Sequence, residues 1–283
     1  MHLIRALFLL FACLAGPVAC TPVAFLAANL PASFAPGERF ANLAYGPGRR
    51  QRLDVYTPAD GAAPHPVVVF IHGGSWQAGS KDRYRFVGAA LASPGIVAVV
   101  INYRLNPEVR FPVFVEDAAA AVAWTLRNAG AYGGDPRRVF VMGHSAGAHS
   151  AVLLGLDPRY LAAAGASTHD LRGVIGLSGP YDFGIDSAPL RAIFGGADFP
   201  STQPVRQARG DAPPLLLIHG TGDRVCWPAN SIRLTERVRR AGGEAALRLY
   251  PGLGHSATIG AFTSLRRASA PTLADVVAFV RGP

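Results

Sequence analysis

Cysteine is scarce in this chain of 283 residues. There are three cysteines, and two of them, Cys13 and Cys20, lie within the first twenty residues. Cys226 is then alone in the rest of the chain, which excludes a disulfide within that part. The stability of the folded part must therefore come from buried apolar side chains rather than from cross-links. We predict that Cys226 is a packed thiol, because no pairing with a histidine is evident in its neighbourhood.

Charged residues are also few, at 16% of the chain against 50% hydrophobic residues. This composition allows a large core and excludes global disorder. The formal net charge is +9, yet the basic residues are scattered in pairs such as Arg49-Arg50, Arg239-Arg240 and Arg266-Arg267. No basic stripe interleaved with aromatic residues is present, so we expect no nucleic-acid partner. Attraction to an anionic envelope surface, or solubility alone, explains the charge better.

Several common cofactor motifs are missing. The sequence has no HExxH motif, no paired CxxC motifs and no phosphate-binding loop. Metal and nucleotide chemistry therefore have no support, and we expect no cofactor.

The first twenty residues have the pattern of an export leader. Arg5 supplies a positive charge, and residues 6–16 form an apolar stretch shorter than the roughly 20 residues that span a bilayer. Residues 17–20 (PVAC) resemble a bacterial lipobox, which predicts Cys20 as a lipidated residue. Pro17 stands where such leaders usually carry leucine, so a simply cleaved signal peptide remains the alternative. We expect an exported protein, periplasmic or envelope-anchored, whose membrane contact is an N-terminal lipid.

The remainder of the chain reads as one α/β domain over residues 37–283, joined to the leader by a tether at 21–36 and interrupted by an excursion over the site at 181–214. Expected strands lie at 52–56 (an antiparallel edge strand), 66–71, 96–102, 139–142, 173–177, 215–219 and 245–250. Expected helices lie at 81–92, 115–128, after 145, at 231–241 and at 271–280. This alternation predicts a mostly parallel central sheet covered by helices on both faces.

The segment at 143–147, Gly-His-Ser-Ala-Gly, joins a buried strand to a helix. Such a turn is so tight that only small residues fit on both sides of the serine, and it raises the serine hydroxyl above the sheet. We predict Ser145 as a nucleophile. His144 and His149 flank it, and we expect both to be packed or hydrogen-bonded rather than catalytic.

Two later loops supply the partners that a serine nucleophile needs. Asp223 follows the strand at 215–219, and His255 follows the strand at 245–250. In the fold that carries this turn the order along the chain is Ser, then Asp or Glu, then His. We predict that Asp223 orients His255 and that His255 accepts the serine proton. Asp182 and Asp186 also follow a strand near this edge and remain alternatives to Asp223.

The glycine-rich turn after the strand at 66–71 supplies N–H donors for a developing oxyanion. We predict the N–H groups of Gly74, Ser75 and Ala146 as that oxyanion hole. Trp76 is predicted as a wall of the substrate pocket. His72 and His219 each precede a glycine at a strand end, and we expect both to brace loops by hydrogen bonds.

Five segments together resemble the α/β-hydrolase superfamily: HGGSW (72–76), NYRL (102–105), GHSAGAH (143–149), HGTGDRV (219–225) and GLGH (252–255). They are most similar to small bacterial carboxylesterases of the feruloyl-esterase-like or kynurenine-formamidase-like type. The resemblance runs from about residue 50 to the C-terminus and implies neither a metal nor an organic cofactor. Ser75 departs from the third glycine of hormone-sensitive-lipase relatives. Trp227 stands where such enzymes often have proline, and is predicted to shape the acyl pocket.

The resulting hypothesis is a serine hydrolase that cleaves small-molecule carboxylic esters through an acyl-enzyme. Two alternatives remain open at this point. One is an arylformamidase-type amide hydrolase with the same three residues, and the other is a non-catalytic surface binding protein on a hydrolase fold. Acyl chain length, the alcohol and the oligomeric state are not indicated by the sequence.

Overall fold

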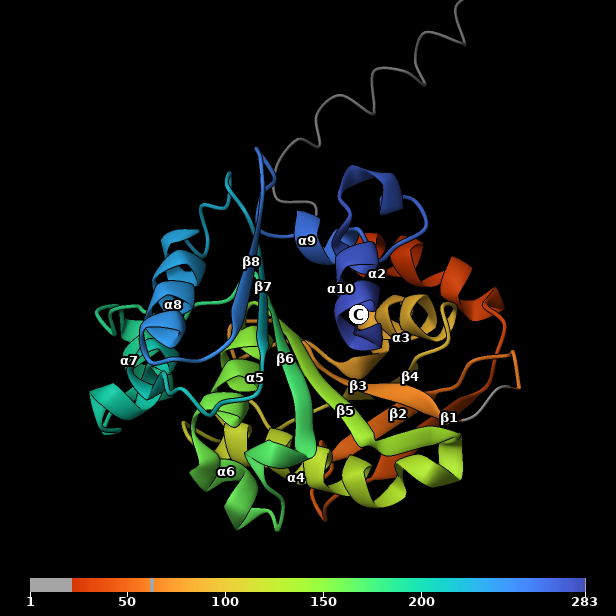
Figure 1. Cartoon of the computed structure of the whole chain (residues 1–283), viewed down its shortest axis with the longest axis horizontal. Coiled ribbons are helices and arrows are strands. Elements are labelled where there is room, and N and C mark those ends of the chain that lie inside the picture. Colours follow the sequence, from red (N-terminus) through yellow and green to blue (C-terminus); the bar gives the residue numbers. More distant parts are fainter. Residues whose placement is uncertain (1–21, 62–63, 283) are drawn as a thin grey trace, which may run out of the picture.

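An eight-stranded sheet organises the chain, in the strand order β1-β2-β4-β3-β5-β6-β7-β8 (Figure 1). It is seen in a computed structural model that describes residues 22–61 and 64–282. The strands are β1 (Arg39–Ala44), β2 (Arg52–Tyr56), β3 (His65–Ile71), β4 (Val97–Ile101), β5 (Gly134–His144), β6 (Leu171–Leu177), β7 (Leu215–Gly220) and β8 (Ala245–Tyr250). β1 and β2 are antiparallel to their neighbours, and every pairing from β4 onward across the sheet is parallel. The predicted fold class is confirmed.

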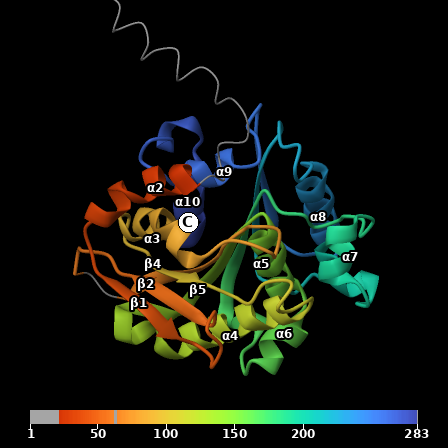
Figure 2. The same cartoon turned by 180° about the vertical axis from the view of Figure 1, so that it is seen from behind.

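Helices cover both faces of this sheet (Figures 1 and 2). One face is covered by α4 (Val113–Asn128), α5 (Ala146–Leu156), α6 (Pro158–Ala163), α7 (Ala188–Phe194) and α8 (Ala229–Arg240). The other face carries α2 (Pro22–Asn29), α3 (Arg85–Ala92), α9 (Ala257–Gly260) and α10 (Thr272–Arg281). Short 3₁₀ helices occur at η2 (Pro31–Phe34), η3 (Lys81–Tyr84), η4 (Ala129–Tyr132), η5 (Thr168–Asp170), η6 (Phe199–Thr202), η7 (Pro204–Gln207) and η8 (Arg267–Ser269).

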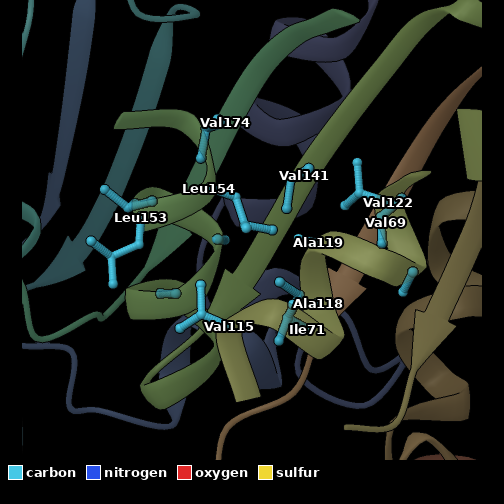
Figure 3. Packing of buried hydrophobic residues seen from close by; sticks show 14 of the residues in the cluster. Val69, Ile71, Val115, Ala118, Ala119, Val122, Val141, Leu153, Leu154 and Val174 are labelled. Carbon is cyan, nitrogen blue, oxygen red and sulfur yellow. The ribbon is translucent and has the colours of Figure 1, made fainter. Parts of the chain in front are cut away.

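The central strands are buried on both faces, because successive side chains of a strand point to opposite sides of the sheet. In β3, Val67, Val69 and Ile71 pack under α4 and α5, while Val68 and Phe70 pack under α3. Figure 3 shows the first of these cores, where side chains of β3, β5 and β6 meet those of α4 and α5. The uninterrupted apolar run of β3 is thus explained by its central place in the sheet.

The structure differs from the sequence-based expectations at the N-terminal side. β2 is antiparallel as predicted, but it is not an edge strand, since β1 pairs with it from outside. Residues 22–34, within the stretch expected as a tether, form α2 and η2, for which no helix was expected. The Asn29 side chain fixes this segment by donating to the carbonyls of Asp82 and Arg83, at 3.1 Å each, and by accepting from the Phe86 N–H at 3.0 Å. A polar contact with a distant helix is not visible in local sequence.

Within the described ranges, none of the helices combines the length and the apolar character needed to cross a bilayer.

The parallel pairing decides where the functional side chains gather. Strands β3, β5, β7 and β8 all run in the same direction, so their carboxyl ends meet at one edge of the sheet. The glycine-rich turn, the Ser145 turn, the Asp223 loop and the His255 loop each follow one of these ends. Ligands of open α/β sheets bind at this edge.

Candidate active site

The Ser145 turn is held in a strained conformation by close backbone packing. Ser145 lies between β5 and α5 with φ 56° and ψ −124°. This is the positive-φ region of the backbone, which residues other than glycine rarely adopt. A Cβ atom on Gly143 would approach the Gly147 carbonyl oxygen to 2.2 Å, and one on Gly147 would approach the Ile71 oxygen to 2.1 Å. Both glycines are therefore required for α5 to start directly above β3. The Ser145 N–H donates to the Leu177 carbonyl at 2.9 Å.

Three side chains far apart in sequence form one hydrogen-bonded chain. Ser145 Oγ lies 2.9 Å from His255 Nε2, and His255 Nδ1 lies 2.8 Å from Asp223 Oδ2. Because the carboxylate can only accept, His255 donates from Nδ1, and its Nε2 is the acceptor for the serine hydroxyl. This is the geometry that a general base needs in order to take the serine proton.

Asp182 and Asp186, the alternatives to Asp223, are engaged elsewhere. Asp182 pairs with Arg233 at 2.5 Å. The backbone carbonyl of Asp186 accepts from the Arg191 side chain. Neither carboxylate contacts His255, so the acid of this hydrogen-bonded chain is Asp223.

A second histidine contacts Asp223 and was not predicted to do so. His219 Nε2 lies 3.1 Å from Asp223 Oδ2 and 2.7 Å from the Cys226 carbonyl oxygen, and its Nδ1 lies 2.7 Å from Ser231 Oγ. Both neighbours of Nε2 are acceptors, so Nε2 carries the proton and Nδ1 accepts from the serine hydroxyl. The sequence signal was the spacing, since His219 ends a strand four residues before the acid and both side chains point into the same loop.

The Asp223 carboxylate is fully buried and is held in its charged form. Burial alone would raise its pKa, but hydrogen bonds from His219 and His255 and from the Cys226 N–H hold the pKa well below its usual range. Its other oxygen, Oδ1, accepts from the Val225 and Cys226 N–H groups at 2.9 Å each. A fixed negative charge thus lies next to Nδ1 of His255.

The predicted oxyanion donors lie beside the Ser145 turn. A Cβ atom on Gly73 would come within 3.1 Å of the Ser145 Cβ, which shows how closely the glycine-rich turn approaches the nucleophile. Gly74 has φ 125° and Ser75 φ 53°, so the turn presents its backbone in an uncommon conformation. Among the described residues, the N–H groups of Gly74 and Ser75 have no acceptor, and Ala146, as the first residue of α5, has none within its helix.

The glycine-rich turn is held in place by hydrogen bonds and by ring stacking. Tyr103 Oη donates to the His72 carbonyl at 2.9 Å, and His72 Nδ1 donates to the Gly73 carbonyl at 2.8 Å. The His72 ring is stacked between Tyr84 and Tyr103, with ring centroids at 5.9 and 4.5 Å. The bracing role expected for His72 agrees with these contacts.

The remaining histidines near Ser145 are buried and outside the hydrogen-bonded chain. His144 Nε2 donates to the His255 carbonyl at 3.2 Å, and His149 Nε2 donates to the Thr202 carbonyl at 2.8 Å. Burial lowers the pKa of His144 to about 3, with the neighbouring His255 adding to the effect, and lowers that of His149 to about 4. Both rings are therefore neutral near pH 7, which agrees with the packing role expected for them.

The two tryptophans predicted as pocket residues lie in different surroundings. Trp76 is 4% exposed and packs against Phe114, Phe194 and His149. Trp227 is 67% exposed in the loop that follows Asp223. The contact with Phe194 comes from the excursion at 181–214, which packs against Trp76 next to the glycine-rich turn. A pocket role for either tryptophan stays a prediction.

Cys226 is a buried free thiol. Burial raises its pKa to about 12, and the nearby Asp223 charge acts in the same direction against a weaker opposing hydrogen bond with Ser145. The thiol is therefore protonated and unreactive near neutral pH, as expected for a packing residue. Cys20 lies outside the described residues, so its lipidation stays a prediction.

Two cavities border the domain, and neither is lined by Ser145, Asp223 or His255. One of about 290 Å³ is lined by His144 and Ser256 from the two turns and by Phe25 and Tyr84 from the N-terminal part. A larger one, of about 820 Å³, lies between α4, α6 and residues 195–201. Within the described part of the chain, no group of three His, Cys, Asp or Glu side chains is placed to hold a metal ion.

A mostly parallel sheet with a serine on a strand–helix turn, followed by an acid and a histidine on later loops, defines an α/β hydrolase. More narrowly, the chain belongs to the BD-FAE family, whose profile matches residues 53–238. The resemblance stated from the motifs is confirmed.

Curated relatives carry esterase and formamidase names. A probable isoprenylcysteine alpha-carbonyl methylesterase of Oryza sativa subsp. japonica is 33% identical over 234 residues, covering 75% of this chain and 56% of that protein. Esterase LipC of Mycobacterium tuberculosis is 34% identical over 236 residues, covering 75% and 58%. Kynurenine formamidase of Salmo salar is 32% identical over 142 residues, covering 50% and 46%. The chain thus spans little more than half the length of the first two.

Solved structures share the architecture. Esterase B of Lactobacillus rhamnosis superposes with a TM-score of 0.77 at 21% identity, over 92% of this chain and 93% of that one. The propionate-bound Est2 of Thermogutta terrifontis superposes with a TM-score of 0.71 at 26% identity, over 87% and 93%.

The buried neutral histidines make stability depend on pH. Burial lowers the pKa of His72 to about 3, that of His144 to about 3 and that of His149 to about 4, from an ordinary value of 6.5. Below pH 6.5 the unfolded chain binds protons on these rings and the folded protein does not. The free energy of unfolding should therefore fall as the pH is lowered from 6.5 toward 4, by up to about 1.4 kcal/mol per pH unit for each ring. Urea unfolding across this range measures the slope.

The variant His149→Gln is the matched control for that slope. It removes one titrating ring, so the proton uptake on unfolding between pH 6 and 5 should drop by about one relative to the parent. An unchanged uptake would contradict the assignment, whatever the variant does to the absolute stability.

Proposed function

We propose that this chain is a serine hydrolase that cleaves small-molecule carboxylic esters through an acyl-enzyme. The observation that carries the proposal is the hydrogen-bonded chain from Ser145 through His255 to Asp223, at 2.9 and 2.8 Å. Membership of the BD-FAE family and the esterase names of relatives at 33–34% identity support the same activity. A non-catalytic binding protein would have no need of a nucleophile held in a strained turn.

In the proposed acylation, Ser145 Oγ attacks the ester carbonyl carbon as its proton passes to His255 Nε2. The imidazolium that forms is stabilised by the buried charge of Asp223 through Nδ1. When the tetrahedral intermediate collapses, the carbon–oxygen bond to the alcohol breaks and His255 returns the proton to the leaving alkoxide. Water then repeats the sequence on the acyl-enzyme, with His255 again as the base, and releases the acid.

The developing oxyanion is assigned to the backbone N–H groups of Gly74, Ser75 and Ala146. Their lack of acceptors among the described residues and the close approach of Gly73 to Ser145 support this assignment. Donors fixed in advance cost no reorganisation during reaction, and each contributes about a hundred- to thousand-fold in rate.

Formamide hydrolysis is the second candidate, favoured by the likeness to kynurenine formamidase over half of this chain. It would use the same three residues, with an aromatic amine as the leaving group. Ester cleavage is preferred because the longer alignments are with esterases, and because an amide nitrogen must be protonated before it can leave.

The variant Ser145→Ala tests the nucleophile. Removing the attacking oxygen should lower kcat for p-nitrophenyl acetate by about 10⁴-fold or more, with an unchanged thermal unfolding midpoint. Labelling by a fluorophosphonate probe should be seen in the parent protein and be lost in the variant. A parent protein that takes no label would favour the non-catalytic alternative, and a variant that keeps its activity would reject the mechanism.

Substrate preference separates the two hydrolytic candidates. We expect kcat/KM for p-nitrophenyl acetate to exceed that for N-formylkynurenine, with both activities lost in Ser145→Ala. The opposite ranking would identify the protein as a formamidase while leaving the three residues in their roles.

The contact between His219 and Asp223 predicts a positioning role that kinetics can measure. In His219→Leu the carboxylate loses one of its donors, so it is less firmly oriented toward His255. His219 does not touch substrate, so kcat should fall while KM stays near its parent value.

Two matched variants separate positioning from simple destabilisation. His219→Gln keeps an N–H donor and should restore part of kcat. Ser231→Ala removes the hydrogen bond on the far side of the ring and should lower stability with a smaller loss of kcat. If His219→Leu and Ser231→Ala lowered kcat equally, the positioning role would be rejected.

A further inference from the structure

One side of the N-terminal helices presents large apolar side chains to solvent. Val23, Leu26 and Leu30, spaced three and four residues apart, are 74%, 70% and 61% exposed, and Phe34 in η2 is 82% exposed. Residues 23–37 include no charged side chain. Isolated exposed apolar residues are common on protein surfaces, but a row of four on adjoining turns indicates an interaction surface.

The opposite side of α2 is firmly attached to the domain. The Phe25 ring packs edge-on against Tyr84, with centroids 5.3 Å apart. Asn29 makes three hydrogen bonds to the backbone of η3 and α3. Figures 1 and 2 show α2 beside α3 and near α9 in both views. The exposed row is therefore held in a fixed orientation on the catalytic domain.

A neighbouring loop extends the same surface. Leu265 is 75% exposed and, with Arg266, lines a cavity together with Ala27 and Ala28 of α2. Arg267 lines an adjoining cavity with residues of η2. We call Val23, Leu26, Leu30, Phe34 and Leu265, with Arg83, Arg266 and Arg267, the docking face.

The charges of the docking face are of one sign. The Arg83 guanidinium lies 5.7 Å from the Phe25 ring, at the border of α2. Within the described residues, none of the three arginines has an ion-pair partner, and the nearby Asp82 is paired with Arg39, Lys81 and Arg85. An apolar row bordered by free arginines is the arrangement of surfaces that insert into the interface of anionic membranes.

We propose that the docking face binds the surface of an anionic lipid bilayer, with its apolar side chains among the acyl chains and its arginines at the head groups. A second copy of this chain fits less well, because a two-fold contact through this face would bring unpaired arginines together in a protein of net charge +9. The predicted leader ends directly before α2, and the predicted lipid site at Cys20 would place this helix at the bilayer. The domain itself then contacts the membrane, beyond the N-terminal lipid expected from the sequence.

Tryptophan quenching in vesicles tests the docking face in the full chain. The variants Leu26→Trp and Phe199→Trp each add one exposed indole. Phe199 lies in η6, outside the docking face, and is 44% exposed. Both variants carry the same leader, so any anchoring by residues 1–21 is matched. In phosphatidylglycerol vesicles doped with brominated lipid, the indole at 26 should be quenched about twofold more than the one at 199, relative to the parent protein.

The charge contribution is tested in the Leu26→Trp background. Replacing Arg83, Arg266 and Arg267 by Gln should remove the additional quenching, as should vesicles of phosphatidylcholine alone. Unchanged hydrolysis of a soluble ester verifies that each variant is folded.

Equal quenching at positions 26 and 199 would overturn the proposal. A second overturning result would come from acrylamide quenching measured without vesicles. If the indole at 26 became better protected from acrylamide as the protein concentration rose, a second copy of the chain would be the occupant. If quenching of the indole at 26 were unchanged both by the lipid charge and by the three substitutions, the anionic partner would be rejected.

Discussion

The close contact between the start of α5 and the end of β3 is the constraint on which the rest of the site depends. The Gly147 Cα lies so near the Ile71 carbonyl that a methyl group there would overlap it at 2.1 Å. This close packing accompanies a turn from strand to helix within one residue, which holds Ser145 at a positive φ. The energy that this conformation costs is offset by a sheet and helix that are buried on both sides.

Around this turn, the site is built from the ends of parallel strands, and its central side chains are hydrogen-bonded one to the next. The serine hydroxyl meets His255, His255 meets Asp223, and Asp223 is held in turn by His219 and by two backbone N–H groups. Each added donor favours the charged carboxylate in a place that water does not reach. The reactive hydroxyl is thus connected to Ser231 on α8, through two histidines and one acid.

The two faces of the sheet contribute differently to this edge. On the α4 and α5 side, the excursion at 181–214 packs Phe194 against Trp76, next to the glycine-rich turn. On the α3 side, α2 forms a wall of the cavity that His144 and Ser256 line, while its outer side carries the docking face.

The fold class, the Gly-His-Ser-Ala-Gly turn at 143–147 and the chain order of the candidate acid and histidine could be predicted from sequence. Each prediction rests on short-range patterns: apolar runs, glycines at fixed spacing, and loops after strands. Features that depend on contacts between distant segments could be seen only in the folded chain. Asp223 rather than Asp182 meets His255, His219 supports the acid, β1 lies outside β2, and residues 22–34 form helices. None of these has a local signature, because each is set by which surfaces the folded sheet brings together.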